Sequence, residues 1–127
     1  MVSMKKLFLF QIILFIGFLI LLTGCNNIKK SPSETVKSAY MAANAGKYAE
    51  ANDFLCQKAL TLAKALGEEA AWDMATKNRT ITKIEILEEK ISGQEARVYF
   101  RLYFEDGSYR NDEEVLVFEN GRWKICY

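Results

Sequence analysis

The sequence predicts an α+β domain over residues 31–127, with N-terminal helices packed on a curved four-stranded antiparallel meander. Apolar residues recur at helical spacing from Val36 to Ala75, and after Asn78 the period changes to two. The dipeptides Asp106-Gly107 and Asn120-Gly121 are typical of tight hairpin turns. Helices that precede a run of hairpin-connected strands pack together on one face of the sheet.

The helical half divides at glycines. Ser31-Pro32-Ser33-Glu34 combines a capping serine, a proline at the first helical position and an acidic first turn, so a helix should begin there and end at Gly46. A short second helix is expected from about 47 to 55. A third ends at Gly67, and a fourth covers about 68–77.

After Asn78, the alternating pattern and the turn dipeptides predict four strands, at roughly 80–91, 95–105, 108–119 and 122–127. Alternation in the second strand places four apolar side chains on the core face: Val98, Phe100, Leu102 and Phe104. It sends four others to the opposite face, away from the helices: Arg97, Tyr99, Arg101 and Tyr103.

The first 24 residues have the three parts of a secretory signal. Lys5 and Lys6 precede an apolar run from Leu7 to Leu22, and Leu22-Thr23-Gly24-Cys25 resembles the lipobox of bacterial lipoprotein signal peptides. The resemblance implies cleavage before Cys25 and attachment of acyl chains such as palmitate to that residue. A retained transmembrane helix is the alternative, although the run is shorter than the ~20 residues that span a bilayer comfortably. Both alternatives place the domain outside the cytoplasm, at the membrane of the cell envelope.

Residues 25–30 form a short polar tether that keeps the domain near the bilayer. The mature chain has 103 residues (127 minus 24), enough for one small domain. Only Lys5 and Lys6 of the 17 basic residues lie in the leader, so the mature charge is 15 minus 16, or −1. Without a basic stripe, nucleic acid is not an expected partner.

The sequence leaves open whether Cys56 and Cys126 form a disulfide. An extracytoplasmic location permits one. Alternation along the last strand, however, puts Cys126 on the face of Lys124 and opposite Ile125. This parity favours two separate thiols over a bridge.

The order of three segments resembles that of a known group: Ser31–Val36, Gly46–Ala51 and Gly121–Ile125. The chain is similar to small bacterial lipoproteins with a lumazine-binding-like domain of unknown function, within the nuclear-transport-factor-two-like (cystatin-like) superfamily. The resemblance implies a cone, in which the curved sheet wraps the first helix and leaves a pocket at its open end. One such fold hosts enzymes and binding modules alike.

The residues offer little for catalysis. The chain has no histidine, so Cys56 lacks the usual partner for a nucleophile. The core face of the second strand has no ionisable group, and Asp53 and Asp73 are expected on solvated helix surfaces. Adjacent acidic residues, as in Asp112-Glu113-Glu114, point to opposite faces of a strand and do not close on one metal ion. We therefore predict no metal, no cofactor and no enzymatic activity.

Two functions remain open from the sequence. The first is a non-catalytic module that binds a protein or small-molecule partner, with Arg97, Tyr99, Arg101 and Tyr103 as the candidate surface, since exposed Tyr and Arg are favoured at interfaces. The second is a small-molecule enzyme of the isomerase or dehydratase type, as the resemblance implies for the cone pocket. Proton transfer in the cone needs a buried ionisable side chain, and binding does not.

Overall fold

The computed structural model describes residues 30–126; the predicted signal peptide and Cys25 lie outside the described residues. The helices are α2 (Pro32–Asn44), α3 (Tyr48–Asn52), α4 (Gln57–Leu66) and α5 (Glu68–Thr76). The strands are β1 (Ile81–Ser92), β2 (Glu95–Phe104), β3 (Tyr109–Glu119) and β4 (Arg122–Ile125). Helices first and strands afterwards confirm the predicted α+β class.

The first helix begins at the predicted cap. The Ser31 hydroxyl accepts from the Glu34 amide at 3.2 Å, and the Ser31 amide donates back to the Glu34 carboxylate at 3.4 Å, with Pro32 between them. A carboxylate of the sheet adds to this cap, since Glu89 accepts from the amide and the hydroxyl of Ser33 at 2.9 and 2.8 Å. These contacts fix the start of α2 against β1.

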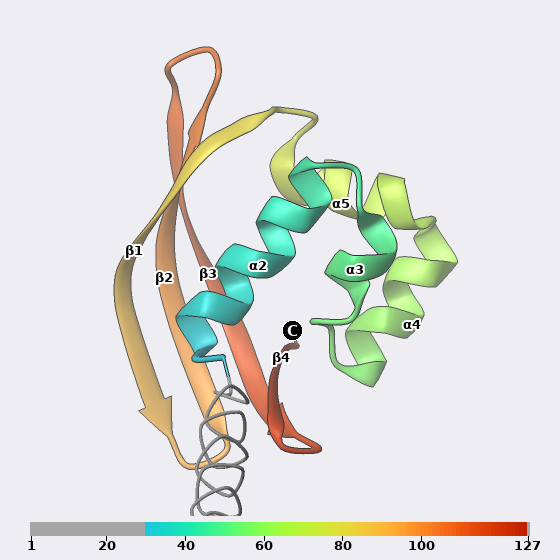
Figure 1. Ribbon diagram of the computed structural model, residues 1–127, viewed down its shortest axis with the longest axis vertical. Helices are drawn as coiled ribbons and strands as arrows, with labels where there is room; N and C mark the ends of the chain where they lie inside the picture. Colours follow the sequence, from blue (N-terminus) through green and yellow to red (C-terminus); the bar gives the residue numbers. More distant parts are fainter. Residues whose placement is uncertain (1–29, 127) are drawn as a thin grey trace, which may run out of the picture.

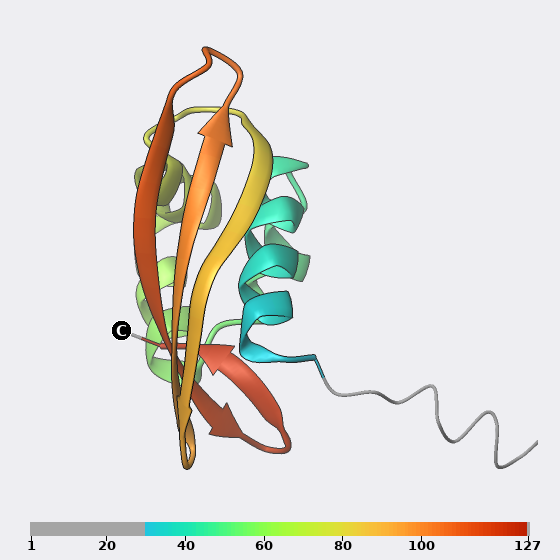
Figure 2. The ribbon, with the colours of Figure 1, turned by 90° about the vertical axis from the view of Figure 1, so that its left-hand side faces the viewer.

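The four strands form one antiparallel sheet in the order β1-β2-β3-β4, a simple meander. Figure 1 shows the long strands curving around α2, with all the helices on one side. Figure 2, turned to face the other side, shows strands in front and helices behind. Two register shifts in β1, one of them between Ile86 and Glu88, accompany its bend.

The core lies between the inner face of the sheet and α2. The predicted core residues of β2, Val98 to Phe104, are at most 3% exposed. Tyr40 of α2 is 2% exposed, and its ring contacts Phe100 and Trp72 with centroids 5.2 and 5.5 Å apart. Aromatic rings at these separations add to the burial energy of each side chain.

Cys56 and Cys126 form a disulfide, so the parity argument for two separate thiols is wrong. Alternation describes the last strand alone and does not show what lies along its other edge. Ile125 pairs with Leu116 of β3 on one side and with the segment before α4 on the other: its amide donates to the Phe54 carbonyl at 2.7 Å, and its carbonyl accepts from the Cys56 amide at 2.9 Å. This pairing brings the Cα atoms of the two cysteines to 5.3 Å.

Within residues 30–126, no helix has the length and apolar character needed to cross a bilayer.

Candidate functional site

The four predicted surface residues of β2 lie together on the outer face of the sheet. Arg97 is exposed, and Tyr99, Arg101 and Tyr103 are half-buried among residues of β1 and β3. In the part of the chain that the structure describes, no helix covers this face (Figure 2). The predicted placement is therefore confirmed, while its role in binding stays a prediction.

Both arginines of the outer face are held by β3. Arg97 pairs with Glu113 at 2.7 Å, and Arg101 donates through Nε to the side-chain oxygen of Asn111 at 2.8 Å. The Arg101 guanidinium also lies 4.5 Å from the ring centre of Tyr109. Such stacking holds a guanidinium in place while leaving its other donors available.

The outer-face tyrosines contact cations of β1. Lys90 lies 5.8 Å from the ring centre of Tyr99, and Lys83 lies 5.4 Å from that of Tyr103. The Tyr103 hydroxyl donates to Glu85 at 3.2 Å. The outer face is thus a ladder of rings and charges that contact one another across the three long strands.

The inner face contains an ionisable group that the sequence analysis missed. Glu114 of β3 points toward α2, where it accepts a hydrogen bond from the Tyr40 hydroxyl at 2.6 Å. Burial raises the pKa of the Glu114 carboxyl to about 7, with the charges of Asp112 and Glu113 acting in the same direction and the Tyr40 hydrogen bond opposing them. The predicted lack of an ionisable group on the core face of β2 therefore does not extend to β3.

The same period-two rule would have found this carboxylate if it had been applied to β3. Arg110, Asp112, Glu114 and Leu116 share one face of that strand, and Leu116 is fully buried. On β2 the alternation is clear because the inward side chains from Ala96 to Phe104 are all apolar. On β3 the inward side chains change from charged to apolar toward β4.

Two further charges lie beside Glu114. Arg110 pairs with Asp112 at 3.1 Å and donates to the Ala75 carbonyl at the end of α5. Its Nε is buried and has no hydrogen-bond partner among the described residues. This part of the inner face of β3 is therefore polar, with Asp112 paired to Arg110 and Glu114 to Tyr40.

A small cavity adjoins Glu114. Its volume is about 50 Å³, and its wall is mostly apolar. The lining residues are Tyr40, Leu55, Ala63, Ala71, Trp72, Ala75, Glu114 and Ile125. Ligand pockets usually measure about 300–1,000 Å³, so this space has room for a water molecule or two rather than a substrate.

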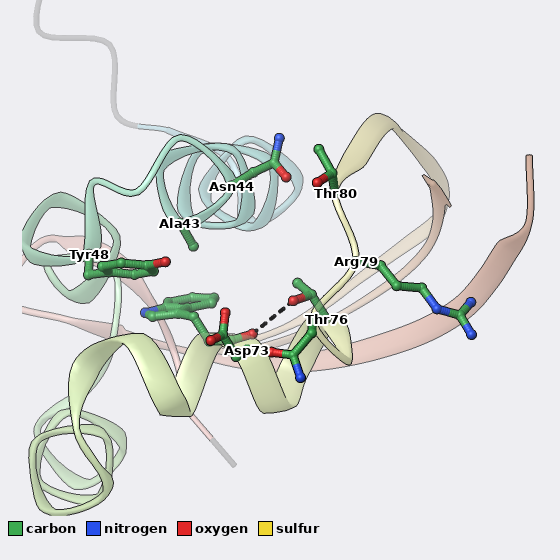
Figure 3. Close-up of a pocket in the computed structure, with 9 residues that line it drawn as sticks. Ala43, Asn44, Tyr48, Asp73, Thr76, Arg79 and Thr80 are labelled. Carbon is green, nitrogen blue, oxygen red and sulfur yellow. Dashed lines mark hydrogen bonds between the residues drawn. The ribbon is translucent and has the colours of Figure 1, made fainter. Parts of the chain in front are cut away.

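A larger, polar cavity of about 210 Å³ lies where α2, α3 and α5 meet the loop before β1 (Figure 3). Asp73 and Tyr48 contribute to its wall, and Arg79 points away from the other side chains. Asn44 lines it too, but its amide group already bonds both backbone groups of Ile81, at 3.0 and 2.8 Å. Asp73 is half-buried here, whereas Asp53 is exposed as predicted.

Among residues 30–126, no three metal-ligating side chains come close enough to share an ion. Glu113 and Glu114 point to opposite faces of β3, where their separate partners are Arg97 and Tyr40. The alternation predicted for this acidic run is confirmed.

Solved structures of low sequence identity share the fold. A Campylobacter jejuni protein provisionally described as an NTF2-like transpeptidase superposes with a TM-score of 0.61 at 11% identity, over 76% of this chain and 97% of the other. A SEC-C motif containing protein from Rhodopseudomonas palustris superposes with a TM-score of 0.62 at 16% identity, over 76% of each chain. At such identities the likeness establishes an NTF2-like fold and no activity.

No curated protein matches the chain in sequence. One family model does match, over residues 23–126, which is most of the chain. The helix-then-meander order and the NTF2-like likeness describe the architecture of that matched region. The chain belongs to the DUF4878 family, a domain of unknown function.

Proposed function

We propose that this protein is a membrane-anchored extracytoplasmic lipoprotein whose domain is a non-catalytic binding module. The observation that carries the proposal is the outer face of the sheet, which no helix covers among the described residues (Figure 2). Along β2, this face presents Arg97, Tyr99, Arg101 and Tyr103 in turn. Tyr and Arg in ordered positions are the residues that supply most binding energy at interfaces. The partner is a protein or a small molecule with planar or polar groups that stack on these rings.

The anchoring part of the proposal is supported by the lipobox-like Leu22-Thr23-Gly24-Cys25. The family match begins at residue 23 and leaves the apolar run outside it, as expected if the conserved unit starts near Cys25. The resemblance to lumazine-binding-like lipoproteins supports the same assignment. Two acyl chains would give stable membrane attachment where one gives marginal binding.

The test of anchoring is Cys25→Ser in the full chain. We expect the variant to accumulate as an unprocessed precursor or to leave the membrane fraction, as judged by fractionation and by mass spectrometry of the mature N-terminus. A variant of mature length that fractionates with the membrane like the parent would end the lipoprotein assignment.

The test of binding uses a photo-reactive amino acid placed at Tyr99 or Tyr103 in cells. The matched control position is Lys37, an exposed residue on α2 on the opposite side of the sheet. We expect cross-linked products from the two sheet positions that Lys37 does not give. Products common to all three positions, or none from the sheet, would overturn the choice of surface.

The partner identified in this way then permits a measurement of affinity. Tyr99→Ser with Tyr103→Ser removes both rings, and we expect binding to weaken by about tenfold or more. Tyr48→Ser is the control for loss of a half-buried tyrosine ring on the helical side of the sheet. Equal affinity of the double variant and the parent would contradict the proposal.

A second candidate function is the isomerase or dehydratase type of enzyme, favoured by one observation. The carboxyl of Glu114 has a pKa of about 7 and contacts the Tyr40 hydroxyl, an arrangement suited to proton transfer. The cavity of about 50 Å³ beside it speaks against a bound substrate. A small carbonyl compound that raises the melting temperature of the parent but not of Glu114→Gln would favour the enzyme over the binding module.

A further inference from the structure

The helix α4 presents two of its three leucines to solvent, while Leu60 packs against the core. It buries Ala59 and Ala63 and leaves Leu62 and Leu66 at 47% and 49% exposure. A helix that serves only the core turns its largest apolar side chains inward. The two outward leucines, one turn apart, therefore form a stripe that core packing does not explain.

The charge on α4 has one sign. Lys58 and Lys64 are exposed, and the segment Gln57–Leu66 contains no acidic residue, although acidic and basic residues nearly balance over the whole chain. Lys58 lies one turn before Leu62 and shares its face of the helix, whereas Lys64 points to the other side. A short helix with two leucines and a lysine on one exposed face suits an anionic phospholipid surface.

The start of α4 lies near the point where the tether enters the domain. The Lys30 ammonium lies 5.2 Å from the ring centre of Phe54, two residues before the cap residue Cys56 of α4. The disulfide to Cys126 ties this cap to the end of the sheet. Only residues 26–29 separate Cys25 from Lys30, and a chain of that length spans at most about 18 Å. A bilayer that holds Cys25 is thus within reach of α4.

We propose that α4 lies on the membrane surface, with Leu62 and Leu66 in the boundary between headgroups and acyl chains and with Lys58 against lipid phosphates. The inference rests on the proposed membrane anchoring and adds the face by which the domain meets the bilayer. A second copy of the chain is the other occupant that the exposed leucines could accept.

The test uses the full chain reconstituted in vesicles of phosphatidylglycerol and phosphatidylcholine that contain a phospholipid with a photo-reactive headgroup. We expect lipid adducts, mapped by mass spectrometry, in the peptide that covers residues 57–66. Leu62→Ser with Leu66→Ser should lower this labelling about fivefold or more, since two apolar side chains then leave the lipid. Labelling should also fall in vesicles of phosphatidylcholine alone, which lack the anionic charge.

The matched control is Leu87→Ser with Ile91→Ser on β1, two apolar residues that are 44% and 55% exposed. This variant loses the same number of exposed apolar side chains and should keep the labelling of residues 57–66. Equal loss of labelling in both variants would overturn the inference, as would cross-links between two copies of α4 in place of lipid adducts.

Vesicle flotation separates this inference from the anchoring on which it rests. A chain that floats with the vesicles but shows no lipid adducts on α4 overturns the placement of α4 alone. A chain that does not float overturns the anchoring and the placement together.

Discussion

The two faces of β2 differ in what their side chains do, although one alternating sequence builds both. The inner residues Val98, Phe100 and Leu102 are fully buried against α2 and the rest of the core. The outer residues Arg97 and Tyr103 bond to side chains of neighbouring strands, at 2.7 and 3.2 Å. Burial stabilises far more than exposed pairing does. The inner face therefore supplies stability, and the outer face can change without loss of the fold.

The largest expected effect on stability comes from a comparison of two adjacent residues of β2, one on each face. Phe100→Ala empties a fully buried site beside Tyr40, and we expect it to lower the free energy of unfolding by about 3–5 kcal/mol. Tyr99→Ala, on the outer face, should cost less than about 1 kcal/mol. Urea unfolding of the two variants measures both values. Similar losses would show that the outer face is part of the stabilising structure.

Removal of the disulfide measures how much this link contributes to the stability of the helices packed on the inner face. Cys56→Ala with Cys126→Ala removes a link that spans 70 residues, and we expect a loss of about 4 kcal/mol if the unfolded chain is constrained as loop-closure entropy predicts. Thermal unfolding of the parent with and without reductant should reproduce the loss. A parent whose melting temperature is insensitive to reductant would show that the helices are held by packing alone.

The smallest of the three effects concerns the charged part of the inner face. The pKa of Glu114 is about 7 in the folded protein, against 4.5 for an ordinary glutamate, so between these values the unfolded chain loses the proton first. The free energy of unfolding should therefore fall by about 2–3 kcal/mol as pH rises from 4.5 to 7, and this contribution should change no further above pH 7. Glu114→Gln should remove this fall, as measured by urea unfolding at pH 5 and pH 8.

The neighbouring carboxylate provides the control. Glu113→Gln changes the same charge on the outer face, where Arg97 contacts it, and should keep the fall with pH. If the parent and Glu114→Gln lose stability equally between pH 5 and pH 8, Glu114 is not the group responsible.

Much of the fold could be predicted from local sequence signals. The cap at Ser31, the glycines after the helices and the turns at Gly107 and Gly121 each impose a backbone geometry by themselves, and the structure has boundaries within a few residues of those predicted. Gly107 and Gly121 adopt φ of 83° and 76°, values that favour glycine. Alternation likewise placed the outer-face residues of β2 correctly.

What could not be predicted depends on contacts between distant segments. The disulfide follows from the pairing of Ile125 with Phe54 and Cys56, which no local pattern at either end indicates. The pKa of Glu114 depends on burial beneath α2 and on the hydroxyl of Tyr40, 74 residues away. A strand pattern gives the direction in which Glu114 points but not the helix above it.

The pairing of Leu55 with Ile125 also has a consequence for the order in which the chain folds. A ribosome makes the helical half first, yet the segment that precedes α4 finds its backbone partner only when Ile125 has been made. Contacts across such a separation close late and make folding slow. The domain can therefore close only after Ile125 and Cys126 have been made, and deletion of residues 125–127 would remove both the backbone pairing and the disulfide that join the segment before α4 to the sheet.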